Sequence, residues 1–356
     1  MPISYVPILK WKQGEQGALK EMPEAEKTKF MPLLEILPPT EAQRAKRDYT
    51  TNLQRTLDIV KKSWGCTPFF LDIMTYYISE SVNSIHPLIH AKNIAKEIGI
   101  SPIYVVPFLY DKIYMEFFNK FISKYRVYIA LRVAKDDLLK EDFSLQLQSF
   151  IGKVQKDASR VDLILDFEDV SGKEIEELAN DTISALQTIP FLDKWKSIII
   201  AGTSFPETLS GYNPGENSII RKHWGAWQEV QRIGEKKGIL RPLIFSDYGI
   251  GGVTPPPDYS PFMTMSANIR YTTYDSWAVF KGRSVKTYTY DQYYSLSEMV
   301  TKHSCYMGAS FSQGDEYIEK CARRATSTGN GSTWRKVGTS HHIAFVLEQL
   351  ANLPAV

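Results

Sequence analysis

The sequence predicts an α/β fold, a single (β/α)₈ barrel of the TIM type, from three observations. First, eight short apolar segments rich in β-branched and aromatic residues recur along the 356 residues. Second, every gap between consecutive segments is long enough to hold a crossover helix, which favours parallel strands. Third, no GxGxxG or GxxxxGK(S/T) motif follows any segment, which disfavours a doubly wound sheet, the main alternative.

The eight segments are nearly continuous in hydrophobicity, as expected for parallel strands covered on both faces. They begin at Tyr5, Met31, Pro68, Ile103, Val127, Val161, Lys196 and Pro242. Helical periodicity between them predicts helices over 40–62, 86–98, 174–186 and 217–233. Gly99, directly after the second of these helices, is a natural C-cap. Eight such units predict a closed barrel over 1–356.

The strand–helix pattern breaks after the eighth strand. Residues 251–340 are rich in Gly, Pro, Ser, Thr and Tyr and form an insertion much longer than a usual strand–helix loop. Within it we expect a hairpin that turns near Tyr274 and Asp275, helices over 293–303 and 314–324, and an eighth barrel helix capped by Thr339 or Ser340. An insertion at this point lies on the C-terminal face of a barrel. We expect a subdomain there that acts as a lid or a partner surface.

Composition excludes several classes of protein. The formal net charge of +2 gives no overall basic field for nucleic acid. No apolar run is long enough to span a membrane, and the N-terminus lacks the pattern of a signal peptide. The three cysteines have no ligand-like spacing. We therefore expect a cytoplasmic protein without a disulfide framework.

Charged residues interrupt or end most of the predicted strands. They are Lys10, Glu35, Asp72, Arg132, Asp166, Glu168 and Asp247. A charge within an apolar strand is costly to bury unless it is paired, but at the carboxyl end of a barrel strand it can point into the mouth. We therefore expect Glu35, Asp72, Asp166 and Glu168 to act as general acid/base groups or metal ligands.

Asp166 and Glu168 share one face of their strand if side chains alternate with period two. Their repulsion would raise one pKa unless a cation neutralises the pair. Lys10 and Arg132 are candidate neutralisers, and a hard divalent metal such as Mg²⁺ is another. The alternative is a structural ion network that fixes strand register.

A second set of candidate residues lies in and just after the insertion. Arg and Lys side chains are interleaved there with aromatic rings, which suits phosphate binding with ring stacking. Together with Lys10, Arg132 and Asp247 of the strands, the predicted substrate-binding residues are Arg270, Trp334, Arg335, His341 and His342. A His pair at the start of the expected last helix could bind an anion with the free helix amides. Capping and packing would explain the same pair.

Two stretches resemble a known family. The opening YVPILKWKQGEQGAL with FMPLLEILP, and the ending ANIRYTTYDSWAVFKGR, FSQGDEYI and TWRKVGTSHHIAFV, are similar to the beta-protein family named after a protein of phage T4. The resemblance runs along the full length, and TWRKVGTSHHI is its most specific part. It implies a phage or antiviral-defence context, without a known catalytic mechanism or assigned site.

Two functional hypotheses follow from these patterns. In the first, the chain is a hydrolase or lyase that acts on a phosphorylated substrate, a nucleotide or nucleic acid. In the second, it is a non-catalytic sensor or scaffold of an antiviral system, which binds a ligand at the barrel mouth and a protein partner through the insertion. No HExxH, GxSxG or zinc-type Cys/His cluster points to another reaction.

Overall fold

The computed structural model describes residues 3–73, 86–108, 112–153, 157–255 and 265–353. Eight parallel strands form a closed barrel in the order β1-β2-β3-β4-β5-β6-β7-β9. They are β1 (Tyr5–Lys10), β2 (Leu33–Glu35), β3 (Phe69–Asp72), β4 (Pro102–Pro107), β5 (Ile129–Ala134), β6 (Val161–Asp169), β7 (Ser197–Thr203) and β9 (Ile244–Asp247). Each strand matches one of the eight predicted segments to within one residue at its ends or lies inside it, so the barrel prediction is confirmed.

The barrel closes where β1 pairs with β9, with Tyr5 opposite Phe245. Side chains alternate along each strand between two buried layers. Val6 and Ile8 of β1 belong to the layer inside the barrel, whereas Tyr5 and Leu9 face the surrounding helices. This alternation decides which charged residues reach the mouth and which face outward.

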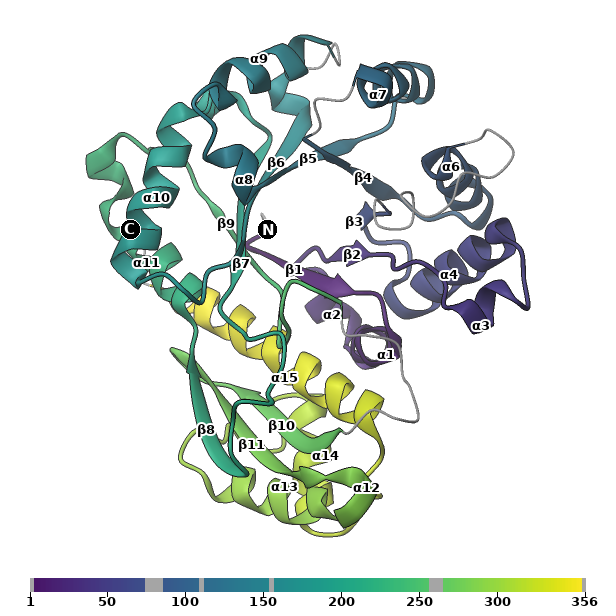
Figure 1. Ribbon diagram of the computed structural model, residues 1–356, viewed down its shortest axis with the longest axis vertical. Coiled ribbons are helices and arrows are strands. Elements are labelled where there is room, and N and C mark those ends of the chain that lie inside the picture. The colour runs from purple at the N-terminus through teal and green to yellow at the C-terminus, as the bar shows by residue number, and fades with distance from the viewer. Residues whose placement is uncertain (1–2, 74–85, 109–111, 154–156, 256–264, 354–356) are drawn as a thin grey trace.

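Helices surround the ring of strands (Figure 1). The larger ones are α1 (Gln13–Glu21), α4 (Tyr49–Trp64), α6 (Pro87–Ile98), α7 (Lys112–Tyr125), α9 (Phe143–Lys153), α10 (Ile175–Thr188), α11 (Lys222–Gly234) and α15 (Gly331–Ala351), with the short α2 (Glu24–Lys27), α3 (Glu41–Arg44) and α8 (Lys135–Leu138) between them. The helix predicted over 40–62 is divided into α3 and α4, because Asp48 caps a new start. Gly99 ends α6 with φ 73°, as predicted.

A smaller antiparallel sheet lies beside the barrel, beyond α15 (Figure 1). Its strands β8 (Gly215–Ile220), β10 (Ser266–Thr272) and β11 (Ser276–Ser284) are in the order β10-β11-β8. The hairpin of β10 and β11 and the helices α13 (Gln292–Lys302) and α14 (Gln313–Ala322) were predicted; the short α12 (Val285–Tyr288) was not. The helix predicted over 217–233 was wrong in its first residues, because 217–220 pair with β11 in β8.

The described part of 251–340 lies to the side of the ring of strands rather than across it (Figure 1). Its sheet also includes β8, which comes from the connection between β7 and α11, outside that range. The stretch 256–264 of the predicted lid lies outside the described residues.

The start of the last helix was predicted wrongly. α15 begins at Gly331, where Asn330 and Thr333 form a capping box, and not near Thr339 or Ser340. The helix lies between the barrel and the small sheet (Figure 1), and the turns in the middle of the helix are buried. A helix covered on two sides lacks the one-sided apolar stripe that periodicity detects.

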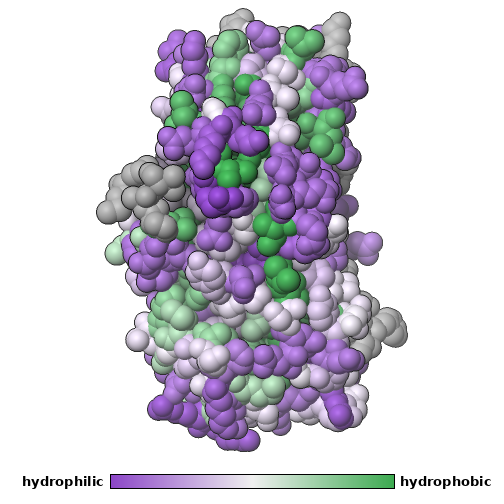
Figure 2. All heavy atoms as spheres, turned by 90° about the vertical axis from the view of Figure 1, so that its left-hand side faces the viewer, coloured by the Kyte–Doolittle hydropathy of each residue, from purple (hydrophilic) through white to green (hydrophobic). Residues whose placement is uncertain are grey.

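No described helix is both long and apolar enough to cross a bilayer. The face in Figure 2 is mostly hydrophilic, with apolar side chains in small separate patches. Single exposed apolar groups of this kind are normal on a protein surface.

Candidate functional site at the barrel mouth

A five-residue ion network fills the carboxyl ends of the barrel strands. Lys10, Glu35, Asp72, Arg132 and Asp166 come from β1, β2, β3, β5 and β6. All five alternate with residues of the outer layer, so they point inward. The predicted convergence of these charges at one end of the barrel is confirmed.

Arg132 is the centre of this network. Its Nη1 donates to Glu35 at 2.7 Å and to Asp72 at 2.8 Å, while Nε and Nη2 donate to Oδ2 of Asp166 at 2.9 and 2.6 Å. Lys10 forms a second ion pair with Glu35. Burial alone would lower the pKa of Arg132, but its contacts with Tyr248 and the carboxylates raise it, so Arg132 stays a cation.

Tyr248, which follows β9, completes the network and was missed by the sequence analysis. Its hydroxyl accepts from Nη2 of Arg132 at 2.8 Å and donates to Asp166 at 2.6 Å. Burial and the nearby Asp166 raise the pKa of Tyr248, so the hydroxyl keeps its proton. All five N–H groups of Arg132 therefore have acceptors within the chain.

Glu168 differs from the three acids that bind Arg132. Its backbone has φ 55°, a left-handed conformation that is uncommon for a non-glycine residue. The pairing of β6 with β7 is irregular between Asp166 and Asp169, so the simple alternation predicted for Asp166 and Glu168 does not hold. The Glu168 amide donates to Asp166 Oδ1. Burial and the Asp166 charge raise the pKa of this half-buried carboxyl.

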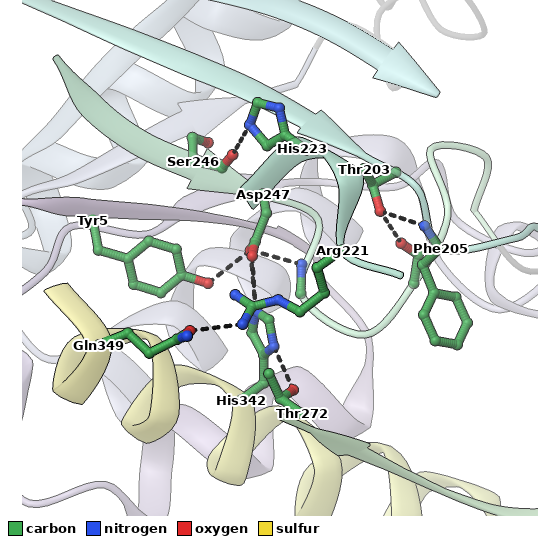
Figure 3. A network of polar contacts seen from close by, with 12 residues as sticks. Tyr5, Thr203, Phe205, Arg221, His223, Ser246, Asp247, Thr272, His342 and Gln349 are labelled. Carbon is green, nitrogen blue, oxygen red and sulfur yellow. Dashed lines mark hydrogen bonds and ion pairs between the residues drawn. The ribbon is translucent and has the colours of Figure 1, made fainter. Parts of the chain in front are cut away.

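Asp247 does not reach the mouth, contrary to the prediction. It belongs to the outward-facing positions of β9, between inward-facing Ser246 and Tyr248, and it meets the inner side of α15 (Figure 3). Its carboxylate accepts from Tyr5 at 2.7 Å and lies 2.9 Å from Nε2 of His342. A side chain enclosed in this way holds the last helix on the barrel.

The two histidines of α15 are also internal, so the predicted anion site at a helix start is wrong. Both lie at the middle of the helix, about three turns from its start, and are fully buried. His342 meets Thr272 at 2.7 Å through Nδ1 (Figure 3). His341 bridges Asp315 and the Thr272 carbonyl, each at 2.9 Å. These contacts match the packing alternative.

Trp334 is likewise part of a core rather than a stacking platform. Its ring stacks on Tyr293 with centroids 4.3 Å apart, and Tyr317 covers an edge. The indole Nε1–H donates to the Thr328 carbonyl at 2.8 Å. A ligand ring would have to displace this packing.

Arg270 and Arg335 form a second candidate site, next to the mouth. Nη1 of both side chains donates to the carbonyl oxygen of Ile250, at 2.6 and 3.2 Å. The two guanidinium groups are therefore close together. Burial and the Arg335 charge lower the pKa of Arg270 well below its ordinary value. Arg335 also lies 3.6 Å from Glu15.

These two arginines line a small cavity of about 80 Å³, together with Lys10 and Tyr248 of the mouth network. Glu15 and Glu207 line it as well. The cavity thus connects the Arg132 network to the arginine pair. The cavity therefore brings together Lys10, Arg270 and Arg335, which the sequence predicted for substrate binding, and Tyr248, which the sequence analysis missed.

The described residues contain no group of three or more His, Cys, Asp or Glu side chains arranged to hold a metal ion. The three mouth acids direct their oxygens at Arg132 instead. A guanidinium at that point would repel a divalent cation. The mouth residues do not fit the predicted Mg²⁺ site.

A further polar cluster lies on the small sheet and was also missed. Nδ1 of His303 is 2.8 Å from Sγ of Cys305, and Nε2 is 3.0 Å from Glu216. The order resembles a nucleophile, a base and an orienting acid. Burial, however, raises the pKa of Cys305 to about 11. The thiol keeps its proton at neutral pH, which disfavours a nucleophilic role.

Comparison with known proteins bears on these observations. A family model described as Beta protein matches residues 5–348, nearly the whole chain. The chain belongs to the Beta protein family. The match includes the strands that carry the mouth network and the part of α15 with Arg335.

Other comparisons add little to this Beta protein family assignment. A comparison with curated proteins found no match. Among solved structures, the YdjI aldolase from Escherichia coli K12 has a similar structure, with a TM-score of 0.37 and 8% sequence identity, over 98% of this chain and 91% of that chain. The family assignment therefore rests on the family model.

Proposed function

We propose that this Beta protein family member is a barrel hydrolase or lyase that acts on a phosphorylated substrate. The observation that carries the proposal is the arginine pair: Arg270 and Arg335 share one carbonyl beside the mouth. Two adjacent, partly buried cations repel each other. A phosphate between them would relieve this repulsion and accept from both planar groups.

Glu168 is the acid/base group of this proposal. A strained backbone at the carboxyl end of a barrel strand, with a raised pKa, is typical of a functional position. Glu35, Asp72 and Asp166 instead hold Arg132, so we assign them a positioning role. Tyr248 and Lys10 belong to the network and also line the cavity. In this proposal they connect the phosphate site to the barrel mouth, where Glu168 acts.

A non-catalytic sensor is the second candidate, and the saturation of Arg132 favours it. A network whose donors are all satisfied can serve structure alone. In this version the arginine pair still binds a phosphorylated ligand, and the small sheet binds a protein partner of an antiviral system. The phage or antiviral context belongs to the proposal in both versions.

The test incubates the purified chain with sugar phosphates and nucleoside monophosphates and follows products by phosphorus NMR. We expect turnover of one substrate class, and a rate about 10² to 10⁴ lower for Glu168→Gln, the usual effect of losing an acid/base group. Arg270→Gln should weaken binding of inorganic phosphate. Glu174→Gln, at an exposed carboxylate beyond β6, is the matched control.

Three results distinguish the candidates. Phosphate binding that depends on Arg270, without turnover of any compound, would support the sensor. Turnover that is unaffected in Glu168→Gln would remove this residue from the mechanism. Phosphate binding that is equal in the parent and Arg270→Gln would contradict both versions.

A further inference from the structure

A groove of about 750 Å³ lies between the start of α1, the α3–α4 region and the start of α15. Its volume is in the range of small-molecule sites. Pro38, Pro39 and Ile59 supply an apolar part of the lining. The mouth network is not part of it.

Positive side chains from three elements line this groove. Arg47 precedes α4, Arg55 lies within α4, and Arg335 belongs to α15. Within the described ranges, neither Arg47 nor Arg55 forms an ion pair. The one acid among the described lining residues is Glu15, and burial raises its pKa. The lining therefore favours an anion with more than one negative charge.

Hydrogen-bond donors also line the groove. α1 starts after Lys12 without a side-chain cap, and Gly331 at the start of α15 belongs to the lining. Amide N–H groups at helix starts favour phosphate oxygens. Trp11 is 5% exposed and lines the groove, yet its indole Nε1–H has no acceptor in the described chain.

The groove adjoins the small cavity of the arginine pair, because Arg335 and Glu15 line both. We infer that the groove binds a nucleoside diphosphate, an extension of the phosphate site proposed above. The diphosphate lies among Arg47, Arg55 and Arg335, and the flat base rests on the proline and isoleucine surface. One phosphate reaches Arg335 at the entrance to the cavity. The inference thus rests on the proposed function and names its substrate class.

The experiment measures binding to the full chain by calorimetry, with ADP, inorganic phosphate and a single-stranded oligonucleotide as separate probes. We expect ADP to bind at least about tenfold more tightly than phosphate. The double variant Arg47→Gln/Arg55→Gln should weaken ADP binding about tenfold or more and leave phosphate binding unchanged. Lys46→Gln/Lys62→Gln removes two exposed charges from the same region, outside the lining, and should bind ADP like the parent.

The outcomes separate this inference from the proposed function. ADP binding no tighter than phosphate, or unchanged in the double arginine variant, overturns the inference; the phosphate site stands if Arg270→Gln still weakens phosphate binding. ADP binding that needs Arg47 and Arg55 but tolerates Arg270→Gln supports the groove and overturns the phosphate site. An oligonucleotide that binds more tightly than ADP, with the same arginine dependence, replaces the nucleotide by nucleic acid.

Discussion

The hydroxyl group of Tyr248 donates a 2.6 Å hydrogen bond to Oδ2 of Asp166 and so joins the residue after β9 to the end of β6. The hydroxyl oxygen of Tyr248 also accepts a hydrogen bond from Arg132. One hydroxyl therefore satisfies a carboxylate and a guanidinium at once. Its removal should be costly although it carries no charge.

Tyr248→Phe removes this oxygen and leaves a partly buried donor of Arg132 unsatisfied. We expect the free energy of unfolding to fall by about 1–3 kcal/mol, measured by urea denaturation. Tyr274→Phe, at a ring that is 67% exposed, should change it little. Equal stability of the two variants would show that water replaces the hydroxyl.

Arg132→Leu removes the cation that Glu35, Asp72 and Asp166 surround. We expect a loss of about 3–5 kcal/mol at pH 7, as for other buried pairs that lose one partner. Repulsion between the remaining acids favours proton uptake in the folded state, so stability relative to the parent should recover as the pH falls from 7 to 5. Arg232→Leu, at an exposed pair, is the control. A deficit that stays constant over this range contradicts the repulsion argument.

Gly314→Ala tests the close packing of α14 on α15. A Cβ atom at Gly314 would lie 2.2 Å from the Val337 carbonyl oxygen, so the helices must move apart. We expect a loss of about 1–3 kcal/mol, the usual cost of overpacking, seen as a lower melting temperature. Gly152→Ala in α9 meets nothing within 4 Å and should be neutral or slightly stabilising. Equal melting of the two variants would mean that α14 shifts at no cost.

Acid should destabilise the protein through its buried histidines. Burial lowers the pKa of His86 to about 4 and lowers those of His223 and His342. The unfolded chain takes up these protons near pH 6.5, before the folded one, so stability is full above that pH and is lost as the pH falls toward 4. His86→Asn keeps a side chain that caps α6 and should make the decline of melting temperature between pH 6.5 and 4.5 shallower. An unchanged slope would assign the decline to other groups.

The barrel could be predicted from sequence because each strand is a continuous apolar segment, as burial on both faces requires. β8 could not, since only Ile219 of its six residues is buried and its pairing with β11 is set by tertiary contacts. The start of α15 was predicted too late in the sequence, because the helix is covered on both sides and lacks a one-sided apolar stripe.

The charged residues of the candidate site could be predicted, because a charged residue at the end of an apolar barrel strand indicates the mouth. Asp247 broke this rule, because its position in the alternation of β9 faces outward, and a single-residue difference in register decides the face. Tyr248 carries no charge, so nothing distinguished it from other aromatic residues. The contact between Arg270 and Arg335 joins residues far apart in sequence, and local patterns cannot reveal such proximity.

The pairing of β1 with β9 also bears on synthesis at the ribosome. The first strand has no neighbour on one edge until residues near Phe245 have left the exit tunnel. The Tyr5 hydroxyl can donate to Asp247 only after β9 has been made, and Asp247 can contact His342 only after α15 has been made. Nascent chains that do not yet include β9 therefore expose an open edge of β1, a template for aggregation.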